Sequence, residues 1–147
     1  MGKLNSGNIC VLIINNQDYL TIRKSEGNRY YPDDVYIYIM SKGKKFLVLE
    51  DSFEYSAYPE ITNAIDIIIN SEVGTIQHVI GAPCSKGGLQ IWFFKNNTQD
   101  IQLKVVRSKH KADRYKAKYS ANISFGTLND WKIKLRELYD KKNEIFK

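Results

Sequence analysis

The sequence predicts an α+β fold, rich in antiparallel β-strand, built from two successive units that each comprise four strands and a helix (ββββα-ββββα). Apolar side chains recur at every second position in several short segments, which is the period of a half-buried strand. Short polar turns separate consecutive segments and favour antiparallel hairpins. After each group of four segments the apolar period lengthens to three or four residues, which is typical of an amphipathic helix.

The 147 residues are expected to form one domain, 1–147, because a chain of this length buries a sizeable core without metals or disulfides. Its two pseudo-repeat halves cover about 8–72 and 76–146 and share the order of elements rather than the residues. No apolar run reaches the ~20 residues that a membrane-spanning helix needs, and the first residues lack the apolar region of a signal peptide. We therefore expect no membrane association.

Four strands are predicted in the first half, and they cover residues 8–14, 19–23, 35–40 and 46–49. Turns are predicted at residues 15–18 and 41–44, where Asn, Asp, Gly and Lys interrupt the apolar alternation. The short stretch 53–55 is expected to extend the sheet.

The first helix is predicted to begin at Pro59, because proline is favoured at the first position of a helix. Ile61, Ala64, Ile65 and Ile68 then share one helical face. A strand remains the alternative for this segment, because isoleucine is β-branched and favours extended backbone.

Four strands are also predicted in the second half, and they cover residues 77–80, 89–94, 101–106 and 114–125. Thr127 is the predicted N-cap of the final helix, and Asp130 three residues later completes a pair that resembles a capping box. The apolar face of this helix contains Leu128, Trp131, Leu135, Leu138, Tyr139 and Phe146. We expect Trp131, Leu135, Leu138 and Tyr139 to pack on the core or to form a dimer interface.

Charge is distributed unevenly along the chain, whose net charge is +6. Residues 1–73 carry 7 Lys/Arg and 10 Asp/Glu, whereas residues 74–147 carry 15 and 6. The first half is therefore at −3 and the second at +9, which indicates an acidic partner for the second half. Nucleic acid is the commonest such partner, and solvation of ordinary surface lysines is the alternative.

One face of the second predicted sheet combines aromatic rings with cations. Trp92 and Phe94 alternate outward on one strand, beside Lys104 on the next. Single-stranded nucleic acid needs this combination, because bases stack on rings and Lys/Arg neutralise phosphates. The predicted nucleic-acid-binding residues are Trp92, Phe94, Lys104, Arg107, Lys109, Lys111, Arg114, Lys116 and Lys118.

Two other interpretations of this face stay open. In the first, Trp92 and Phe94 pack under a helix or against the other sheet, and the cations only protect an exposed sheet edge from pairing. In the second, the face binds a protein partner.

The order of strands and helices resembles that of the Whirly single-stranded-DNA-binding proteins and the related mitochondrial guide-RNA-binding proteins. The stretch ISFGTLNDWKIKLREL is also similar to the strand, polar turn and Trp-bearing helix of a single-unit transcriptional coactivator domain. The resemblance implies two sheets packed across each other, helices that mediate assembly, and single strands lying over the sheet faces. The Lys-Gly-Lys-rich strand motif of the Whirly family is not present as such, since Lys42-Gly43-Lys44 falls in a predicted turn.

Residues for catalysis or metal binding are scarce. His78 is expected to be a structural residue in a strand and His110 to contact phosphate, because neither belongs to a cluster with metal-ligand spacing. The carboxylates Asp33, Asp34, Glu50, Asp51 and Glu54 are expected to lie in turns and at edges. We therefore predict no enzymatic activity, no metal and no cofactor.

The two cysteines are predicted to have no role in a disulfide. Cys10 falls within an apolar strand, and Cys84 falls in a Gly-rich loop. A reducing, cytoplasmic environment is the simplest expectation.

A competing hypothesis is a small bacterial or phage protein that inhibits one protein partner, such as a toxin immunity protein or an anti-defence protein. The chain has 10 tyrosines, a residue type that is enriched in interface cores. Tyr30, Tyr31, Tyr55 and Tyr58 are the candidate contacts. Salt distinguishes the two functions, because phosphate-driven binding weakens steeply as salt rises.

Overall fold

The computed structural model describes residues 8–25, 32–81, 89–107 and 117–146. Sheet A has the strand order β1-β2-β3-β4, and sheet B has the order β5-β6-β7-β8, with antiparallel pairing throughout. The strands are β1 (Asn8–Ile13), β2 (Asp18–Lys24), β3 (Asp34–Ser41), β4 (Lys44–Ser52), β5 (Ile76–Ile80), β6 (Leu89–Phe94), β7 (Asp100–Arg107) and β8 (Ala117–Ser124). The helices are η2 (Phe53–Ala57), α1 (Tyr58–Asn70), α2 (Phe125–Asp140) and α3 (Lys142–Ile145).

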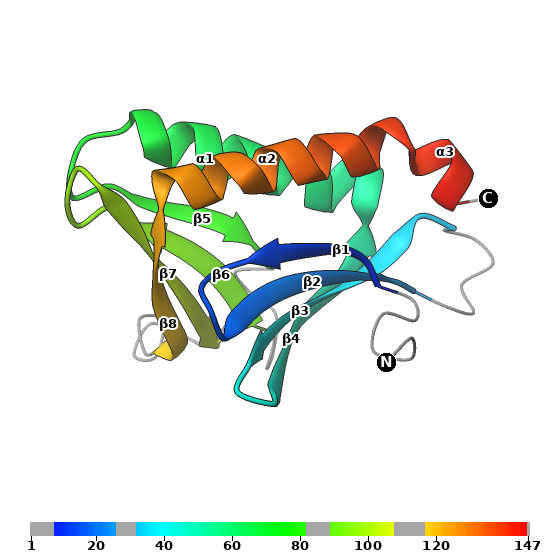
Figure 1. Cartoon of the computed structure of the whole chain (residues 1–147), viewed down its shortest axis with the longest axis horizontal. Coiled ribbons are helices and arrows are strands. Elements are labelled where there is room, and N and C mark those ends of the chain that lie inside the picture. Colours follow the sequence, from blue (N-terminus) through cyan, green and yellow to red (C-terminus); the bar gives the residue numbers. More distant parts are fainter. Residues whose placement is uncertain (1–7, 26–31, 82–88, 108–116, 147) are drawn as a thin grey trace.

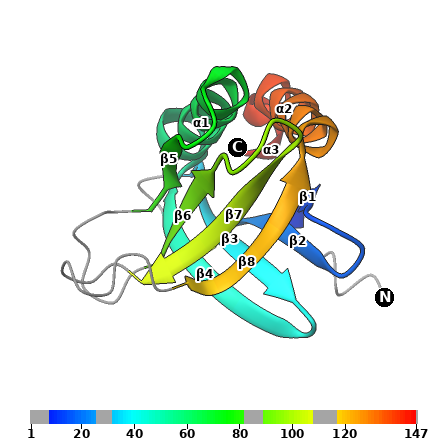
Figure 2. The same ribbon diagram turned by 90° about the vertical axis from the view of Figure 1, so that its left-hand side faces the viewer.

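The predicted α+β class is confirmed, with antiparallel sheets and with helices that follow groups of strands. Helices α1 and α2 lie side by side on one side of the molecule, and the two sheets cross each other on the other side (Figure 1 and Figure 2). A strict repeat of four strands and a helix is matched only roughly, because η2 precedes α1 and α3 follows α2.

The strand boundaries agree with the sequence prediction to within a few residues. The predicted turn at 41–44 is a tight hairpin in which Lys42 and Gly43 both have positive φ, at 52° and 79°. Positive φ at both central residues is the signature of a type I′ turn, whose twist matches that of the strands it joins. The Lys-Gly-Lys sequence is therefore centred on a turn.

The prediction that residues 53–55 extend the sheet is wrong. These residues begin the π-helical turn η2, in which the Ser52 hydroxyl accepts a hydrogen bond from the Tyr55 backbone N–H. Phe53 is fully buried there, and its ring lies 5.8 Å from that of Phe146 and 5.9 Å from that of Tyr58. The helical turn buries the Phe53 ring, and this burial favours the turn over an extension of the strand.

Helix α1 is confirmed, and the alternative of a strand is excluded. Pro59 stands in its first turn, and the predicted apolar face is buried. Ile61, Ile65 and Ile68 are 0% exposed, and Ala64 is 1% exposed. Tertiary packing of this stripe outweighs the β preference of isoleucine, as is usual for a helix of this length.

Helix α2 begins earlier than predicted. Ser124 is the N-cap, and its hydroxyl accepts a hydrogen bond from the Thr127 backbone N–H at 3.1 Å. Thr127 is therefore inside the first turn, and Phe125 is the first helical residue rather than the last residue of a strand. Ser124 competes successfully with Thr127 because serine and threonine are both good caps and the earlier start adds a further helical turn.

The C-terminal residues do not continue the apolar face of α2. Helix α2 ends at Asp140, and the short α3 turns the chain so that Phe146 packs on Phe53 of η2. The Lys24 ammonium of β2 donates to the Ile145 carbonyl at 3.0 Å. The prediction that Phe146 shares a helical face with Trp131 is thus wrong, because the helix does not reach that far.

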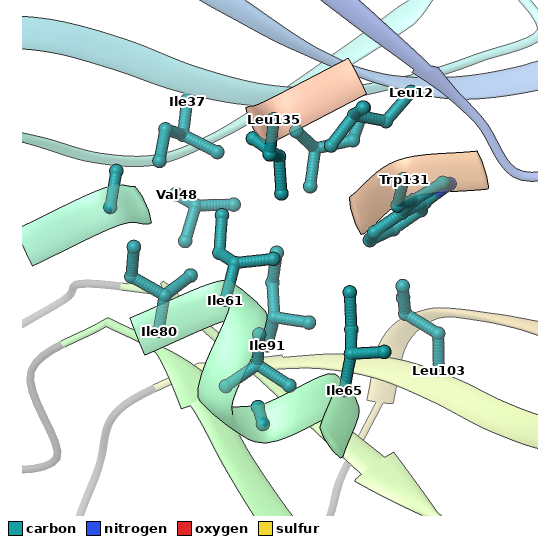
Figure 3. Close-up of a cluster of buried hydrophobic side chains, with 14 of the residues drawn as sticks. Leu12, Ile37, Val48, Ile61, Ile65, Ile80, Ile91, Leu103, Trp131 and Leu135 are labelled. Carbon is teal, nitrogen blue, oxygen red and sulfur yellow. The ribbon is translucent and has the colours of Figure 1, made fainter. Parts of the chain in front are cut away.

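A single hydrophobic core contains side chains from both sheets and both long helices. Figure 3 shows Leu12 and Ile37 of sheet A, Ile91 and Leu103 of sheet B, and Trp131 of α2 around the same centre. Leu135 is 0% exposed and Leu138 is 5% exposed. Trp131, Leu135 and Leu138 therefore pack within the chain's own core. Tyr139 is partly exposed and stacks on Tyr58, with ring centroids 4.3 Å apart.

Lys95 connects sheet B with the end of α1. Its side chain is only 6% exposed, and its ammonium donates to the Ile69 carbonyl at 2.8 Å and to the Ser71 carbonyl. The last carbonyls of a helix have no partner within the helix. Lys95 satisfies two acceptors at this end, and its positive charge also suits the negative end of the helix dipole.

Replacing Lys95 by methionine is expected to lower the free energy of unfolding by about 2–3 kcal/mol, because acceptors at the end of α1 lose a buried charged donor. Urea unfolding at neutral pH measures this effect. Lys132→Met is the control, because Lys132 pairs with Asp66 at the surface, with the two side chains 38% and 53% exposed. A surface pair contributes at most about 1 kcal/mol. Equal losses in the two variants would contradict the role of Lys95.

A buried carboxylate connects the two sheets. Asp18, which is 7% exposed, accepts a hydrogen bond from the Tyr119 hydroxyl of β8 at 2.6 Å and from the Asn15 side chain at 3.0 Å. Burial acts to raise the pKa of Asp18, but donors from Tyr119, Ser41 and Asn15 and the charge of Lys42 outweigh it, and the net pKa is lowered. Burial and the same carboxylate raise the pKa of Tyr119.

Replacing Tyr119 by phenylalanine is expected to destabilise the chain by about 1–3 kcal/mol at pH 7, because a buried carboxylate loses a donor. A lowered folded-state pKa stabilises the protein above the unfolded-state pKa of about 3.9, and this contribution is lost as pH falls through the folded-state value. The difference between wild type and Tyr119→Phe should therefore shrink when unfolding is measured near pH 3. A difference that is constant with pH would show that the carboxylate is not the partner that matters.

Candidate nucleic-acid interface

The strand register of sheet B aligns its outward side chains in two rows. One row runs His78, Trp92, Lys104 and Ser120 from β5 to β8. The neighbouring row runs Ile76, Phe94, Gln102 and Asn122. Directly paired residues on one face have Cβ atoms about 4.5–5.5 Å apart. We call these eight side chains the aromatic–lysine face.

This face points away from the core. Ile91 and Phe93 on β6 and Leu103 and Val105 on β7 are all 0% exposed, so the residues between them point outward. Trp92, Phe94 and Lys104 are partly exposed. The structure therefore brings the two predicted rings and the first predicted cation together on one outer surface.

Trp92 is held in a fixed orientation. Its indole N–H donates to the Gln90 side-chain oxygen at 3.1 Å. The His78 ring meets it edge to face, with centroids 5.0 Å apart and planes at 70°. His78 is fixed in turn because its Nε2–H donates to the Gly81 carbonyl at 2.7 Å. A ring that is already oriented loses little conformational entropy when a base stacks on it.

Lys104 lies over the Phe94 ring, with its ammonium 4.4 Å from the ring centroid. A cation–π contact at an exposed site contributes about 0.5–1 kcal/mol. A base stacked on an aromatic side chain contributes about 1–3 kcal/mol. A base can therefore displace the ammonium from Phe94 with a net gain, and the released lysine can reach a phosphate.

The polar residues of the face are amides and hydroxyls rather than acids. Gln102 accepts a hydrogen bond from the Asn96 side chain at 3.0 Å, and Asn122 and Ser120 are exposed beside it. Neither row contains a carboxylate, so nothing within the rows repels a phosphate backbone. Gln90 and Val106, which pair on the same side, are buried at 5% and 1% exposure and mark the limit of the open surface.

Two further predicted cations lie off these rows. Lys118 is exposed, but it occupies a bulge in β8, because Val105 pairs with Tyr119 and Val106 with Ala117. Arg107 pairs with Leu89 at the end of β7 and lies on the same side of this strand as Leu103 and Val105, which point inward. It is therefore not on the face that carries Trp92. The bulge is a tertiary feature that simple alternation along residues 114–125 does not anticipate.

The remaining predicted cations, Lys109, Lys111, Arg114 and Lys116, lie outside the described residues, as do His110, Cys84, Tyr30 and Tyr31. Sequence reasoning assigned His78 a structural role and did not include it in the site. The register shows that it also belongs to the row of Trp92. The only feature of the sequence that could have indicated this is that His78 follows Ile76 by two residues, and thus lies on the same side of a short strand.

Three acidic residues of the first half, Asp33, Asp51 and Glu60, have structural partners. Asp33 accepts hydrogen bonds from the Ser52 hydroxyl at 2.7 Å and from the Glu54 backbone. The Ser56 hydroxyl oxygen lies 3.0 Å from a carboxylate oxygen of Asp51 and 2.8 Å from one of Glu60, so its single proton is shared between them. Within the described parts of the chain, no group of three or more His, Cys, Asp or Glu side chains is placed to hold a metal ion. These carboxylates organise η2 and its approach to α1.

Cys10 lacks the features of a reactive cysteine. Burial raises the pKa of its thiol to about 11, while Lys134 and Glu137 have smaller, opposing effects. The thiolate is the reactive form, so this side chain stays protonated and unreactive at neutral pH.

Comparison of the sequence with protein-family models and with curated proteins finds no match. Among the described residues, no helix is both long enough and apolar enough to cross a bilayer.

Proposed function

We propose that the chain binds single-stranded nucleic acid, without catalysis and with little sequence preference, on the aromatic–lysine face of sheet B. The observation that carries the proposal is the row in which His78, Trp92 and Lys104 are direct cross-strand neighbours. Stacking of bases on Trp92 and Phe94 supplies an interaction that duplex DNA cannot make, because its bases are already stacked. Lys104 neutralises phosphates beside the rings, and the exposed Lys118 supplies a further cation on β8, off their rows.

Charge supports the same function. The half of the chain that contains sheet B carries +9, and seven Lys/Arg fall between residues 104 and 118 with one acid, Asp113. A basic surface raises the local concentration of a polyanion and accelerates association. We further propose that the two halves are equivalent four-strand-plus-helix units, of which the second is specialised for the polyanion.

Fluorescence anisotropy of a labelled single strand of about 30 nucleotides tests the proposal, with a duplex of the same sequence as the control. We expect the single strand to bind more tightly than the duplex and its affinity to fall steeply between low and moderate salt. Equal binding of strand and duplex would reduce the interaction to non-specific charge attraction. No binding at low salt would exclude the function.

A further inference from the structure

The outer face of sheet A carries a second set of aromatic side chains, which the sequence analysis did not single out. Leu20, Ile22, Ile37 and Ile39 point inward and are 0–1% exposed. Their neighbours on β2, β3 and β4 point outward. We call this outer surface the tyrosine face, and it comprises Tyr19, Arg23, Tyr36, Tyr38, Met40, Lys45 and Glu50, while Thr21 on the same side is buried at 4% exposure.

The composition of this face is that of a protein interface. Tyr, Met and Arg are enriched at interface cores relative to the rest of a protein surface. Tyr36 and Tyr38 form a tilted pair with centroids 6.1 Å apart, and the Lys45 ammonium lies 4.6 Å from the Tyr38 ring centroid. The helices and sheet B pack on the opposite, inward side of sheet A, where Leu12, Ile37 and Val48 belong to the shared core (Figure 3). Tyr36, Tyr38 and Met40 remain partly exposed.

Charge is polarised along β3 and β4. Lys42, Lys44 and Lys45 lie at the end where β3 turns into β4, and all three are exposed. Glu50 and Asp34 lie at the other end of the same two strands, and Arg23 of β2 lies in the row of Glu50. The β3–β4 part of the face is therefore positive at one end and negative at the other, and it is complementary to its own copy turned end for end.

We propose that the tyrosine face binds the same face of a second copy of this chain in a two-fold symmetric dimer. The symmetry axis lies between the two sheets, perpendicular to the strands, and passes over Tyr38. An axis parallel to the strands would instead bring like-charged ends together, which is unfavourable. An isologous interface of this kind requires a self-complementary surface, and the polarity of the face supplies it.

The register of sheet A then fixes which residues meet. Lys45 and Glu50 lie on β4 in the rows on either side of the Tyr38 row, so Lys45 of one copy faces Glu50 of the other. By the same symmetry Met40 faces Tyr36 across the axis, which is a favourable sulfur–aromatic pairing. Tyr38 meets Tyr38, and sheets pack face to face in this way at about 10 Å with nearly aligned strands.

The available area suits a weak, reversible dimer. A face of three strands and eight residues measures roughly 14 Å by 26 Å from standard strand dimensions, or about 750 Å² over both copies. This is below the usual size of specific interfaces, so the dimer is expected to be weak and transient. The inference stands on sheet A alone and does not depend on nucleic-acid binding by sheet B.

Sedimentation velocity over about 5–500 μM protein tests the proposal through charge reversal. Lys45→Glu faces Glu50 with a like charge, and Glu50→Lys faces Lys45 with a like charge, so each variant alone is expected to weaken dimerisation by at least about tenfold. An equimolar mixture of the two variants should restore a dimer, because each variant then presents to the other the charge it lacks. The chain that carries both reversals should also dimerise.

Lys141→Glu and Glu72→Lys are the matched controls, because both residues are exposed and lie away from the tyrosine face. Thermal unfolding of each variant shows whether the fold is retained, and recovery in the mixture cannot arise from misfolded chains. A wild-type chain that stays monomeric up to the highest concentration would overturn the proposal. So would a dimer that the charge reversals do not affect, since another surface would then form it.

Discussion

Replacing Trp92 by alanine and Lys104 by glutamate in one chain is expected to weaken single-strand binding by roughly a hundredfold at low salt. The loss of one stacked base accounts for about 1–3 kcal/mol. Reversing Lys104 removes a phosphate contact and adds a repulsive charge in the same row, which should also lower the dependence of affinity on salt. Anisotropy titrations at two salt concentrations measure both effects.

The variant chain is expected to fold, because both side chains point outward and are partly exposed. Trp92→Phe with Lys104→Arg is the matched control, because it keeps a ring and a cation at the same positions. Retained affinity in the control and lost affinity in the alanine–glutamate variant would assign binding to the aromatic–lysine face. Unchanged affinity in both would place any nucleic-acid contact elsewhere and leave these residues merely solvated.

Replacing Trp131 by alanine is expected to lower the free energy of unfolding by about 3–5 kcal/mol, the largest effect on stability that we predict. Trp131 is 1% exposed, and its ring lies 6.5 Å from that of Phe93 on sheet B. Its indole N–H also donates to the Ile13 carbonyl of edge strand β1 at 2.6 Å. The substitution thus leaves a cavity between the sheets. It also removes the hydrogen-bond donor of a backbone carbonyl on the edge strand β1.

Urea unfolding monitored by far-ultraviolet circular dichroism measures this loss. Trp131→Phe is the control that separates the two contributions, because it keeps much of the ring but has no N–H donor. We expect it to cost about 1–3 kcal/mol, between wild type and the alanine variant. A loss below about 1 kcal/mol for alanine would show that α2 is not the element that closes the core.

The surroundings of the described tyrosines bear on the competing hypothesis of a protein-binding inhibitor. Two of the tyrosines proposed as contacts differ in their surroundings, since Tyr55 is 79% exposed whereas Tyr58 is stacked on Tyr139. Glu54, with a smaller effect of Asp33, raises the pKa of the Tyr55 hydroxyl. A Tyr55 contact with a protein partner would respond little to salt, whereas binding through Lys104 would respond steeply.

The local sequence pattern predicts the eight strands and the buried face of most of them, but not the helical turn at residues 53–55. Alternation along residues 89–94 and 101–106 placed Ile91, Phe93 and Leu103 inside, and Trp92 and Lys104 outside. Local periodicity is sufficient for this, because the hydrophobic effect selects the buried face and the two-residue repeat fixes the other face.

Which outward residues become neighbours depends on the tertiary structure. The bulge at Lys118 and the inward direction of Arg107 separate two predicted cations from Trp92, while pairing with β5 adds His78 to its row. Phe53 became helical because Phe146, far away in the chain, packs on its ring. The physical reason is that cross-strand register and long-range burial depend on residues distant in sequence, which no local pattern encodes.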